Sequence, residues 1–390
     1  MTTIYLIRHA EAEGNLYRRA QGQYDSNVTP LGRRQIGALA ERFRDVPLDA
    51  LYSSDLTRTQ STASAVLKYH PALPLQTTPL LREQSIGVWE DAAWGNLARD
   101  WPEQMAFFSH NPPKFRVPGS ETVAEVVARM ERALLAIAQK HEGGTVAVFS
   151  HGMAIRALLC TLLGIPLEEI HRVPHGDNTA VHLLRAEERR LRVSYYNDNS
   201  HLPDALSTFA RQSWWRKADG GRSDYDNVVF EPLRFPADEE LYLDCYEATW
   251  LQSHGSLQGY IPAIYHAAAR RHLAENPQLL VKMLREGEFA GLIELDTQQG
   301  QVRNAGWISL IYVEPAYRER RLGVQLLGHA VSLFRAMGRE ALGLHVSQTN
   351  EQAIAFYEHF GFRRLAALDG VGGKLWHMEL DLRRHIYRLP

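Results

Sequence analysis

Two short apolar runs that each stop at a histidine constrain the fold of this chain more than any other feature. The first run, IYLI (Ile4–Ile7), leads into Arg8 and His9, and the second, TVAVFS, leads into His151 and Gly152. Each run has the length and composition of a buried strand, and amphipathic segments follow both. Because ligands of open α/β sheets bind beyond the carboxyl ends of the strands, we expect both histidines at one ligand-binding edge.

The pattern along the chain predicts two domains, and 390 residues are enough for two hydrophobic cores. Apolar runs alternate with amphipathic segments over residues 1–205, which indicates a sheet covered by helices. Periodicity is lost over residues 206–227, where Gly, Ser, Asp and Arg gather, so we predict a linker there. Trp214 and Trp215 suggest that part of this linker packs against a domain. A new alternating series predicts a second α/β domain over residues 228–390.

The amino-acid composition argues against several classes of binding partner. A net charge of -2 offers no general attraction to nucleic acid or to anionic membranes. Arg8 and Glu11 interrupt what would be the apolar region of a signal peptide, and no apolar stretch reaches membrane-spanning length. We therefore expect a cytoplasmic protein. Cys160 and Cys245 lie far apart in apolar surroundings, which argues against a disulfide framework or a cysteine-rich metal site.

Histidines beside arginines suit phosphoryl chemistry without a metal. A neutral imidazole is a nucleophile near pH 7, and a guanidinium matches phosphate oxygens in a bidentate fashion. An isolated Arg-His pair is equally compatible with an ordinary strand end and a surface arginine. The motifs that surround the pair therefore decide between these interpretations.

Six segments occur in the order typical of the histidine phosphatase, or phosphoglycerate mutase-like, superfamily, and about the first 205 residues resemble that family. They are IRHAEAEGN (Ile7–Asn15), QGQYDSNVTPLGRRQ (Gln21–Gln35), SSDLTRTQSTA (Ser53–Ala63), LREQSIGVWE (Leu81–Glu90), PGSET (Pro118–Thr122) and VFSHG (Val148–Gly152). The resemblance implies a three-layer α/β/α sandwich that needs no metal.

The resemblance also implies catalytic roles. His9 would be the phosphorylated nucleophile, and Glu83 would protonate the leaving oxygen. Arg8, Arg58 and a protonated His151 would offset the charge on the phosphoryl oxygens. Glu83 can act as an acid only if burial or its neighbours raise its pKa; the alternative is an ordinary solvated glutamate. Positions of the substrate site are taken by Asn15, Gln21, Gly22 and Gly152.

Two residues after the nucleophile depart from the family pattern. Ala10 and Ala12 stand where the family usually has Gly and Thr. The methyl group of Ala10 should be tolerated if its φ is negative. Hydrolysis is favoured over a mutase reaction because mutases of this family tend to carry longer insertions after the glutamate than this domain can hold. The segment Trp89–Gly119 should form the lid over the substrate, with its aromatic side chains either packed together or facing the substrate.

Roughly residues 228–382 resemble the GNAT acyltransferase superfamily. The resemblance lies in WISLIYV (Trp307–Val313), EPAYRERRLGVQLLGHAVSLF (Glu314–Phe334) and NEQAIAFYEHFGFRRL (Asn350–Leu365). It implies a mixed-sheet α+β fold that binds acetyl-CoA, with the pyrophosphate held by backbone N–H groups where a helix begins. The cofactor-binding residues it implies are Val313, Arg318, Arg320, Arg321, Leu322, Gly323, Val324 and Asn350.

Catalysis in this second domain is less clearly marked. Tyr357 matches the family's acid for the departing thiolate, and the alternative is a helix tyrosine that packs beside Phe360. Arg321 stands where the family has a glycine, and a positive φ there would strain it. The sequence does not identify the general base that would deprotonate the amine. Glu294 is a candidate, and a water relay is equally possible.

Three functional interpretations follow. The leading one is a bifunctional enzyme that hydrolyses a small phosphorylated metabolite and transfers an acyl group from acetyl-CoA to an amine. In the second, a catalytically degenerate acyl-CoA-binding module regulates the phosphatase. The third makes the first domain an inactive scaffold, and a mutase-like phosphotransferase also remains open. The sequence indicates neither the substrates nor the oligomeric state.

Overall fold

The computed structural model describes residues 1–211 and 227–390, which form two compact units. The first unit comprises Met1–Ala92, the described part of Leu97–Asp224, and Arg384–Pro390; Ala93–Asn96 and the described part of Tyr225–Arg383 form the second. Most of the expected linker, including Trp214 and Trp215, lies outside the described residues. The sequence analysis placed residues 384–390 in the second domain, whereas the structure groups them with the first, because Tyr387 and Leu389 pack against its core.

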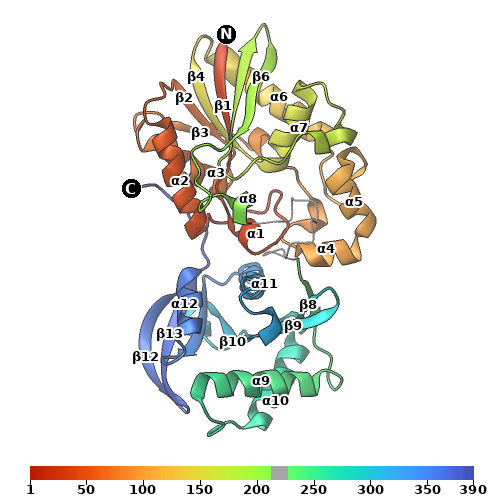
Figure 1. The fold of residues 1–390 in the computed structure, drawn as a ribbon, viewed down its shortest axis with the longest axis vertical. Helices are drawn as coiled ribbons and strands as arrows, with labels where there is room; N and C mark the ends of the chain where they lie inside the picture. Colours follow the sequence, from red (N-terminus) through yellow and green to blue (C-terminus); the bar gives the residue numbers. More distant parts are fainter. Residues whose placement is uncertain (212–226) are drawn as a thin grey trace. The chain divides into compact units, whose positions relative to one another are not determined.

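The first unit is built on a six-stranded sheet with the order β3-β2-β4-β1-β5-β6 (Figure 1). β3, β2, β4 and β1 are parallel to one another, and β5 is antiparallel to both of its neighbours, β1 and β6. The strands are β1 (Thr2–Arg8), β2 (Ala50–Ser53), β3 (Leu75–Thr77), β4 (Thr145–Ser150), β5 (Val181–Glu187) and β6 (Arg190–Asp198). The predicted strand TVAVFS is confirmed with its bounds.

Helices cover both faces of this sheet, as expected for a three-layer sandwich (Figure 1). On one face, α6 (Val123–Lys140) and α7 (Gly152–Leu162) bury Met130 and Leu158 against Leu6 and Val148. On the other face, α2 (Pro30–Phe43) and α3 (Thr57–Leu67) pack against the strand residues of opposite orientation, such as Ile7. Shorter helices in this part of the chain are α1 (Glu13–Leu16), α4 (Trp94–Asp100), α5 (Pro102–His110) and α8 (Thr208–Arg211), with 3-10 turns η1 (Pro79–Leu81), η2 (Gly87–Trp89), η3 (Pro112–Lys114) and η4 (Leu167–Arg172).

The second unit has a seven-stranded sheet with the order β12-β13-β11-β10-β9-β8-β7, in which β10 and β11 are parallel and the other pairs are antiparallel. The strands are β7 (Val229–Pro232), β8 (Leu280–Arg285), β9 (Glu288–Asp296), β10 (Ala305–Val313), β11 (Ala341–Ser347), β12 (Arg363–Gly370) and β13 (Gly373–Asp381). This is the mixed-sheet α+β architecture that the sequence predicted.

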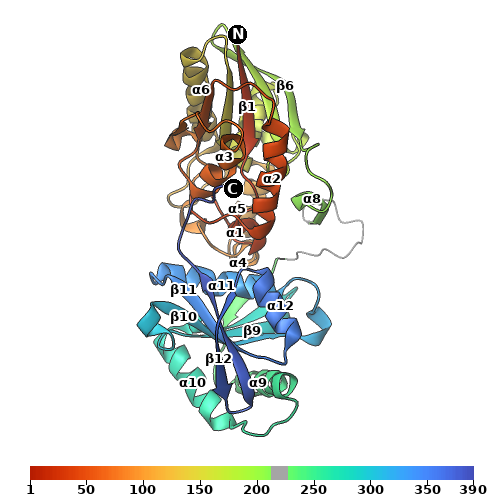
Figure 2. The same ribbon diagram turned by 90° about the vertical axis from the view of Figure 1, so that its left-hand side faces the viewer.

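Two pairs of helices flank the second sheet on opposite faces (Figure 2). They are α9 (Glu239–His254) with α10 (Pro262–Glu275), and α11 (Gly323–Ala336) with α12 (Glu351–His359); 3-10 turns are η5 (Pro277–Leu279), η6 (Gln301–Arg303) and η7 (Pro315–Tyr317). Tyr242 and Cys245 of α9 pack on Leu310 and Tyr312 of β10. None of the helices in residues 1–211 and 227–390 combines the length and the apolar character that a bilayer crossing requires.

Candidate active site

The sheet register brings the two predicted histidines together. β1 and β4 are parallel neighbours, and Arg8 lies opposite Ser150 in their register. The next residue of each strand is therefore a histidine at the same sheet edge, and the ring centroids of His9 and His151 are 5.3 Å apart. Both side chains are buried. The expectation that the two strand ends form one site is confirmed.

Hydrogen bonding fixes the tautomer of His9. Its Nδ1 lies 2.8 Å from the carbonyl oxygen of Ala10. A carbonyl can only accept, so Nδ1 carries the proton and Nε2 keeps its lone pair. Burial and the positive charges of Arg58 and Arg8 lower the pKa of His9 well below its usual value. The ring is therefore a neutral base with Nε2 available for attack. Ala10 has a negative φ, so its methyl group is tolerated, as predicted.

His151 is neutral as well, which corrects the expectation of a protonated ring. Arg58 Nε donates to His151 Nδ1 at 3.2 Å, so Nδ1 must be an acceptor. His151 Nε2 lies 3.0 Å from Ser54 Oγ and carries the remaining proton. Burial and the charge of Arg58 lower the pKa of His151 well below its usual value. His151 thus offers an N–H donor rather than a positive charge.

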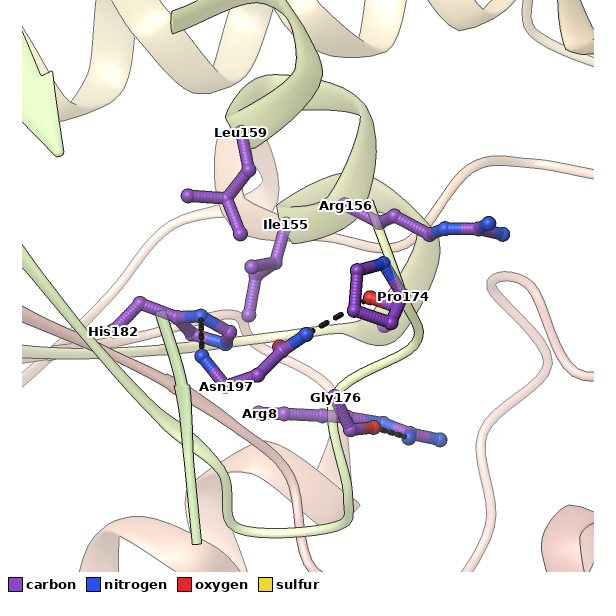
Figure 3. A pocket seen from close by; sticks show the side chains of 9 residues that line it. Arg8, Ile155, Arg156, Leu159, Pro174, Gly176, His182 and Asn197 are labelled. Atoms are coloured by element: carbon purple, nitrogen blue, oxygen red, sulfur yellow. Dashed lines mark hydrogen bonds between the residues drawn. The ribbon is translucent and has the colours of Figure 1, made fainter. Parts of the chain in front are cut away.

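Arg8 supplies one of the two fixed positive charges. Its Nη1 donates to the carbonyl oxygen of Gly176, and its Nε is buried without a hydrogen-bond partner among the described residues. Burial lowers the pKa of Arg8, while Asp177 and Glu83 act in the opposite direction. Arg8 also lines a small pocket together with Gly176 and Asn197, in which the Gly176 carbonyl lies beside the guanidinium and Asn197 lies beside His182 (Figure 3).

Arg58 supplies the second charge from the first turn of α3. Its Nη1 and Nη2 donate to the carbonyl oxygens of Tyr24 (2.8 Å) and Gly22 (2.6 Å), and its Nε donates to His151. A guanidinium has five N–H groups, so two remain for a ligand. Burial lowers the pKa of Arg58 to about 10, which still leaves it charged at neutral pH. The first unit therefore holds two guanidinium groups, of which Arg58 is fully buried and Arg8 is partly exposed, next to a neutral histidine.

Glu83 is held in place by backbone donors and is only 8% exposed. Its Oε1 accepts from Gln84 N (2.9 Å) and Ala154 N (2.8 Å), and its Oε2 accepts from Met153 N (2.9 Å). The donors of Met153 and Ala154 belong to the first turn of α7, where N–H groups have no acceptor within the helix. The alternative of an ordinary solvated glutamate does not describe this side chain.

The predicted substrate-site residues fall into two groups. Gly22 and Gly152 act through their lack of a side chain: a Cβ at Gly22 would lie 2.3 Å from the Gln84 carbonyl oxygen, and one at Gly152 would lie 3.1 Å from Arg8 Nε. Asn15 and Gln21 make local bonds, Asn15 Oδ1 to Ala12 N (3.1 Å) and Gln21 Nε2 to Ser26 Oγ. The structure thus places two glycines against the arginines and gives the two amides roles within their own loop.

Glu90 belongs to the site, and no role for it was predicted from the sequence. Its Oε2 accepts from Gly22 N (3.1 Å) and Tyr24 N (2.7 Å), and its Oε1 accepts from Gln23 N (2.8 Å) and Ile86 N (3.2 Å). The same loop provides the two carbonyl oxygens that hold Arg58. In the sequence, this role in holding the loop is marked only by the glutamate at the end of the LREQSIGVWE segment.

The aromatic side chains of the expected lid segment mostly pack on one another. Trp89 is fully buried, with its ring 4.9 Å from Phe115, 5.9 Å from Phe108 and 6.5 Å from Trp101. Phe108 and Phe115 are 5.1 Å apart. Of the two alternatives for this segment, internal packing accounts for these four rings.

In the second unit, the loop before α11 contains Arg321, the residue that departs from the family pattern. Arg321 adopts a left-handed φ of 57°, the conformation that the family's glycine would take, so the predicted strain is present. Arg318 Nε donates to Val313 O at 3.0 Å, and the Arg320 guanidinium lies over the Tyr317 ring. The loop leads into the unpaired N–H groups of the first turn of α11, which contains Gly323 and Val324 after the cap Leu322. These residues fit an acyl-CoA pyrophosphate.

Tyr357 packs among aromatic side chains of the second unit. Its ring packs 5.3 Å from Phe362 and 5.4 Å from Phe356, and burial raises the pKa of its hydroxyl. The hydroxyl therefore stays protonated at neutral pH. Asn350 caps α12, since its Oδ1 accepts from Ala353 N at 3.1 Å.

Glu294 belongs to a buried network. Its Oε2 accepts from the Tyr242 hydroxyl (2.9 Å), and its Oε1 lies 2.8 Å from His272 Nδ1. Burial lowers the pKa of His272, but Glu294 and Asp296 outweigh this effect and raise it. Glu294 is 1% exposed, so it neutralises a buried histidine and is poorly placed to take a proton from an external amine. Within the described residues, no group of three or more His, Cys, Asp or Glu side chains could hold a metal ion.

The fold and the His-Arg site are those of the histidine phosphatase superfamily. Residues 4–199 match the model of the histidine phosphatase superfamily (branch 1), and the chain belongs to that superfamily. Residues 239–362 match the model of the acetyltransferase (GNAT) family. Among curated relatives, the probable phosphoglycerate mutase GpmB of Yersinia pestis is 37% identical over 176 residues, which are 44% of this chain and 80% of GpmB. The solved structure of Bacillus stearothermophilus YhfR is 30% identical, with a TM-score of 0.50, and the match covers 52% of this chain and 99% of YhfR.

Proposed function

We propose that the first unit hydrolyses phosphomonoesters through a phosphohistidine at His9. The observation that carries this proposal is the Nδ1–H bond of His9 to the Ala10 carbonyl, which leaves Nε2 as a free lone pair beside the guanidinium groups of Arg8 and Arg58. A nucleophile of this kind needs no metal, since Arg8 and Arg58 provide the positive charge that the equatorial phosphoryl oxygens require.

The proposed reaction has two steps. His9 Nε2 attacks phosphorus, the bond to the ester oxygen breaks, and Glu83 gives its proton to the leaving alkoxide. In the second step, water attacks the phosphohistidine while the Glu83 carboxylate takes a proton from it, which releases phosphate and restores His9. The His151 Nε2–H, next to Ser54, would turn towards a phosphoryl oxygen as a neutral donor.

Transfer to a second hydroxyl instead of water is the other candidate for this unit, and the name of the GpmB relative favours it. Phosphorus NMR of reactions with 3-phosphoglycerate and with a panel of other phosphomonoesters distinguishes the two. Hydrolysis predicts inorganic phosphate as the product, and mutase activity predicts phosphate on a different hydroxyl. Only isomerisation of phosphoglycerate, with no release of phosphate from any ester, would refute the phosphatase assignment.

For the second unit we propose acyl transfer from acetyl-CoA to an amine. Acetyl-CoA would supply the acyl group as an activated thioester. The backbone N–H groups from Leu322 to Val324 would hold the pyrophosphate at the start of α11, and the guanidinium of Arg318 closes the loop through the Val313 carbonyl. The Tyr357 hydroxyl, held protonated by burial, would donate to the departing thiolate.

An acyl-CoA sensor without turnover is the alternative for this unit. The arginine at the position of the family's glycine, and the use of Glu294 in an internal network, favour it. Coenzyme A release measured with a panel of amines decides between the two. Turnover that Tyr357→Phe reduces supports the transferase, whereas acetyl-CoA binding without release on any amine supports the sensor.

A further inference from the structure

Residues 384–390, RHIYRLP, lie along the first unit and are bonded to it at alternating positions. Three of their backbone N–H groups donate to side-chain oxygens: His385 to Asn27 Oδ1 (3.0 Å), Tyr387 to Ser61 Oγ (2.9 Å) and Leu389 to Ser64 Oγ (3.2 Å). The spacing of two residues is that of an extended strand. We call these seven residues the strap.

The side chains of the strap alternate in the same way. Tyr387 and Leu389 pack against the core between the sheet and α2 and α3, and the guanidinium of Arg33 lies 5.1 Å from the centre of the Tyr387 ring. Ile386, which precedes Tyr387 and has the opposite orientation, is 46% exposed. One side of the strap therefore packs, partly buried, against the first unit, and the other side faces solvent.

The strap contacts both elements that hold Arg58. Ser61 and Ser64 belong to α3, which carries Arg58 in its first turn. On the other side, the strap contacts the loop of residues 22–27, where Arg384 lies 5.5 Å from the Tyr24 ring centre and Asn27 accepts from His385. This loop provides the carbonyl oxygens for Arg58.

The loop is also joined directly to α3. Asp25 accepts from both the backbone N–H (2.8 Å) and the hydroxyl (2.7 Å) of Thr57, the first residue of the helix. A shift of the loop relative to α3 would therefore change the position of the guanidinium. Ser61 and Ser64 are 0% and 4% exposed, and the strap lies against the face of α3 that carries them.

We propose that the strap is a positioning segment for Arg58: it joins the loop of residues 22–27 to α3 and so sets the guanidinium against His9. The inference rests on the proposed phosphatase function, in which Arg58 binds the transferring phosphoryl group. Neither the family patterns in the sequence nor the matched regions, which end at residues 199 and 362, include the strap.

The test uses a chain that ends at Arg383 and the synthetic heptapeptide RHIYRLP. Loss of the strap should lower kcat on a generic phosphomonoester about tenfold, with KM changed less than about threefold, since a misplaced catalytic group affects the transition state most. Millimolar heptapeptide should restore kcat, because a tethered segment acts at millimolar effective concentration. A scrambled heptapeptide should not.

Single substitutions in the intact chain guard against a folding defect in the shortened one. Tyr387→Ala should lower kcat in the same direction, and Ile386→Ala, on the exposed side of the strap, should leave kcat and KM unchanged. Hydrogen exchange of residues 22–27 and 57–64 should rise when the strap is removed and fall again with the heptapeptide.

The two readouts separate this proposal from the proposed function. If the intact chain hydrolyses no phosphomonoester, the phosphatase function fails and exchange alone decides whether the strap orders the loop and α3. If the intact chain is active, unchanged kcat in the shortened chain overturns the proposal. Heptapeptide that leaves both exchange and kcat of the shortened chain unaltered overturns it as well.

Discussion

Glu90→Gln should weaken both the stability and the activity of the first unit. The carboxylate accepts four backbone N–H groups, two at each oxygen. A glutamine offers one acceptor oxygen and one NH2 group, so the N–H groups of Gly22 and Tyr24 would face a donor. Each unsatisfied buried donor costs about 1–3 kcal/mol, and because Glu90 is only half-buried we expect the lower part, about 2–3 kcal/mol in all.

The effect on activity follows from the same loop. The carbonyl oxygens of Gly22 and Tyr24 hold the guanidinium of Arg58, so a shifted loop moves a phosphoryl-binding charge. We expect kcat/KM to fall about 10- to 100-fold. Glu41→Gln is the matched control, since Glu41 is an exposed carboxylate on α2 and should change neither quantity.

Urea-dependent hydrogen exchange in α3 reports the free energy of unfolding of the first unit separately from the second. The hydrolysis of a generic phosphomonoester reports kcat/KM. A Glu90→Gln variant whose exchange in α3 and kcat/KM both match those of Glu41→Gln would refute the role assigned to this carboxylate.

Four further predictions concern proton transfer, pH and the acyl-CoA loop. Glu83→Gln should lower kcat by about 10²- to 10⁴-fold for alkyl phosphates and much less for p-nitrophenyl phosphate, whose leaving group needs no proton; equal losses on both would argue against an acid role. The pKa values of His9 and His151 lie well below 6.5, so kcat/KM should show no loss of the nucleophile between pH 8 and 6.5, and a limb centred at 6.5 or above would contradict this. Burial lowers the pKa of His182 to about 3, so the unfolded chain takes up a proton on this residue near pH 6.5 while the folded chain does not. The contribution of neutral His182 to the free energy of unfolding is therefore present above pH 6.5 and is lost as pH falls towards 3, by at most about 1.4 kcal/mol per pH unit. Urea unfolding at pH 7 and pH 5 would detect this loss, and equal stability at the two pH values would contradict it. Arg321→Gly should keep the left-handed loop and leave the acetyl-CoA Kd within about threefold by calorimetry; a tenfold loss would mean that the guanidinium itself binds the cofactor.

Local patterns predicted the elements and the edge where the site lies. Arg8, His9 and His151 could be placed because strand ends are visible in the hydrophobic pattern and parallel neighbours share an edge. The left-handed conformation of Arg321 was also foreseen, since the family's glycine marks a backbone requirement rather than a contact.

The remaining features depend on contacts between distant segments, which periodicity does not report. The neutral state of His151 is set by burial and by Arg58, 93 positions away in the sequence, so the expectation of a charged ring was wrong. Glu90 accepts hydrogen bonds from backbone N–H groups of a loop that lies more than 60 positions earlier in the sequence. The strap was assigned to the second domain because it follows the last strand of that domain, and what holds it is a pair of serines on α3.

The central claim is that the phosphoryl group is carried on His9. Rapid-quench mass spectrometry of the intact chain, mixed with a phosphomonoester and stopped in alkali, should find phosphate on the peptide that contains His9. In His9→Ala the adduct should be absent and hydrolysis should fall at least about a thousandfold. Full hydrolysis by His9→Ala, or an adduct on any other residue, would contradict the claim.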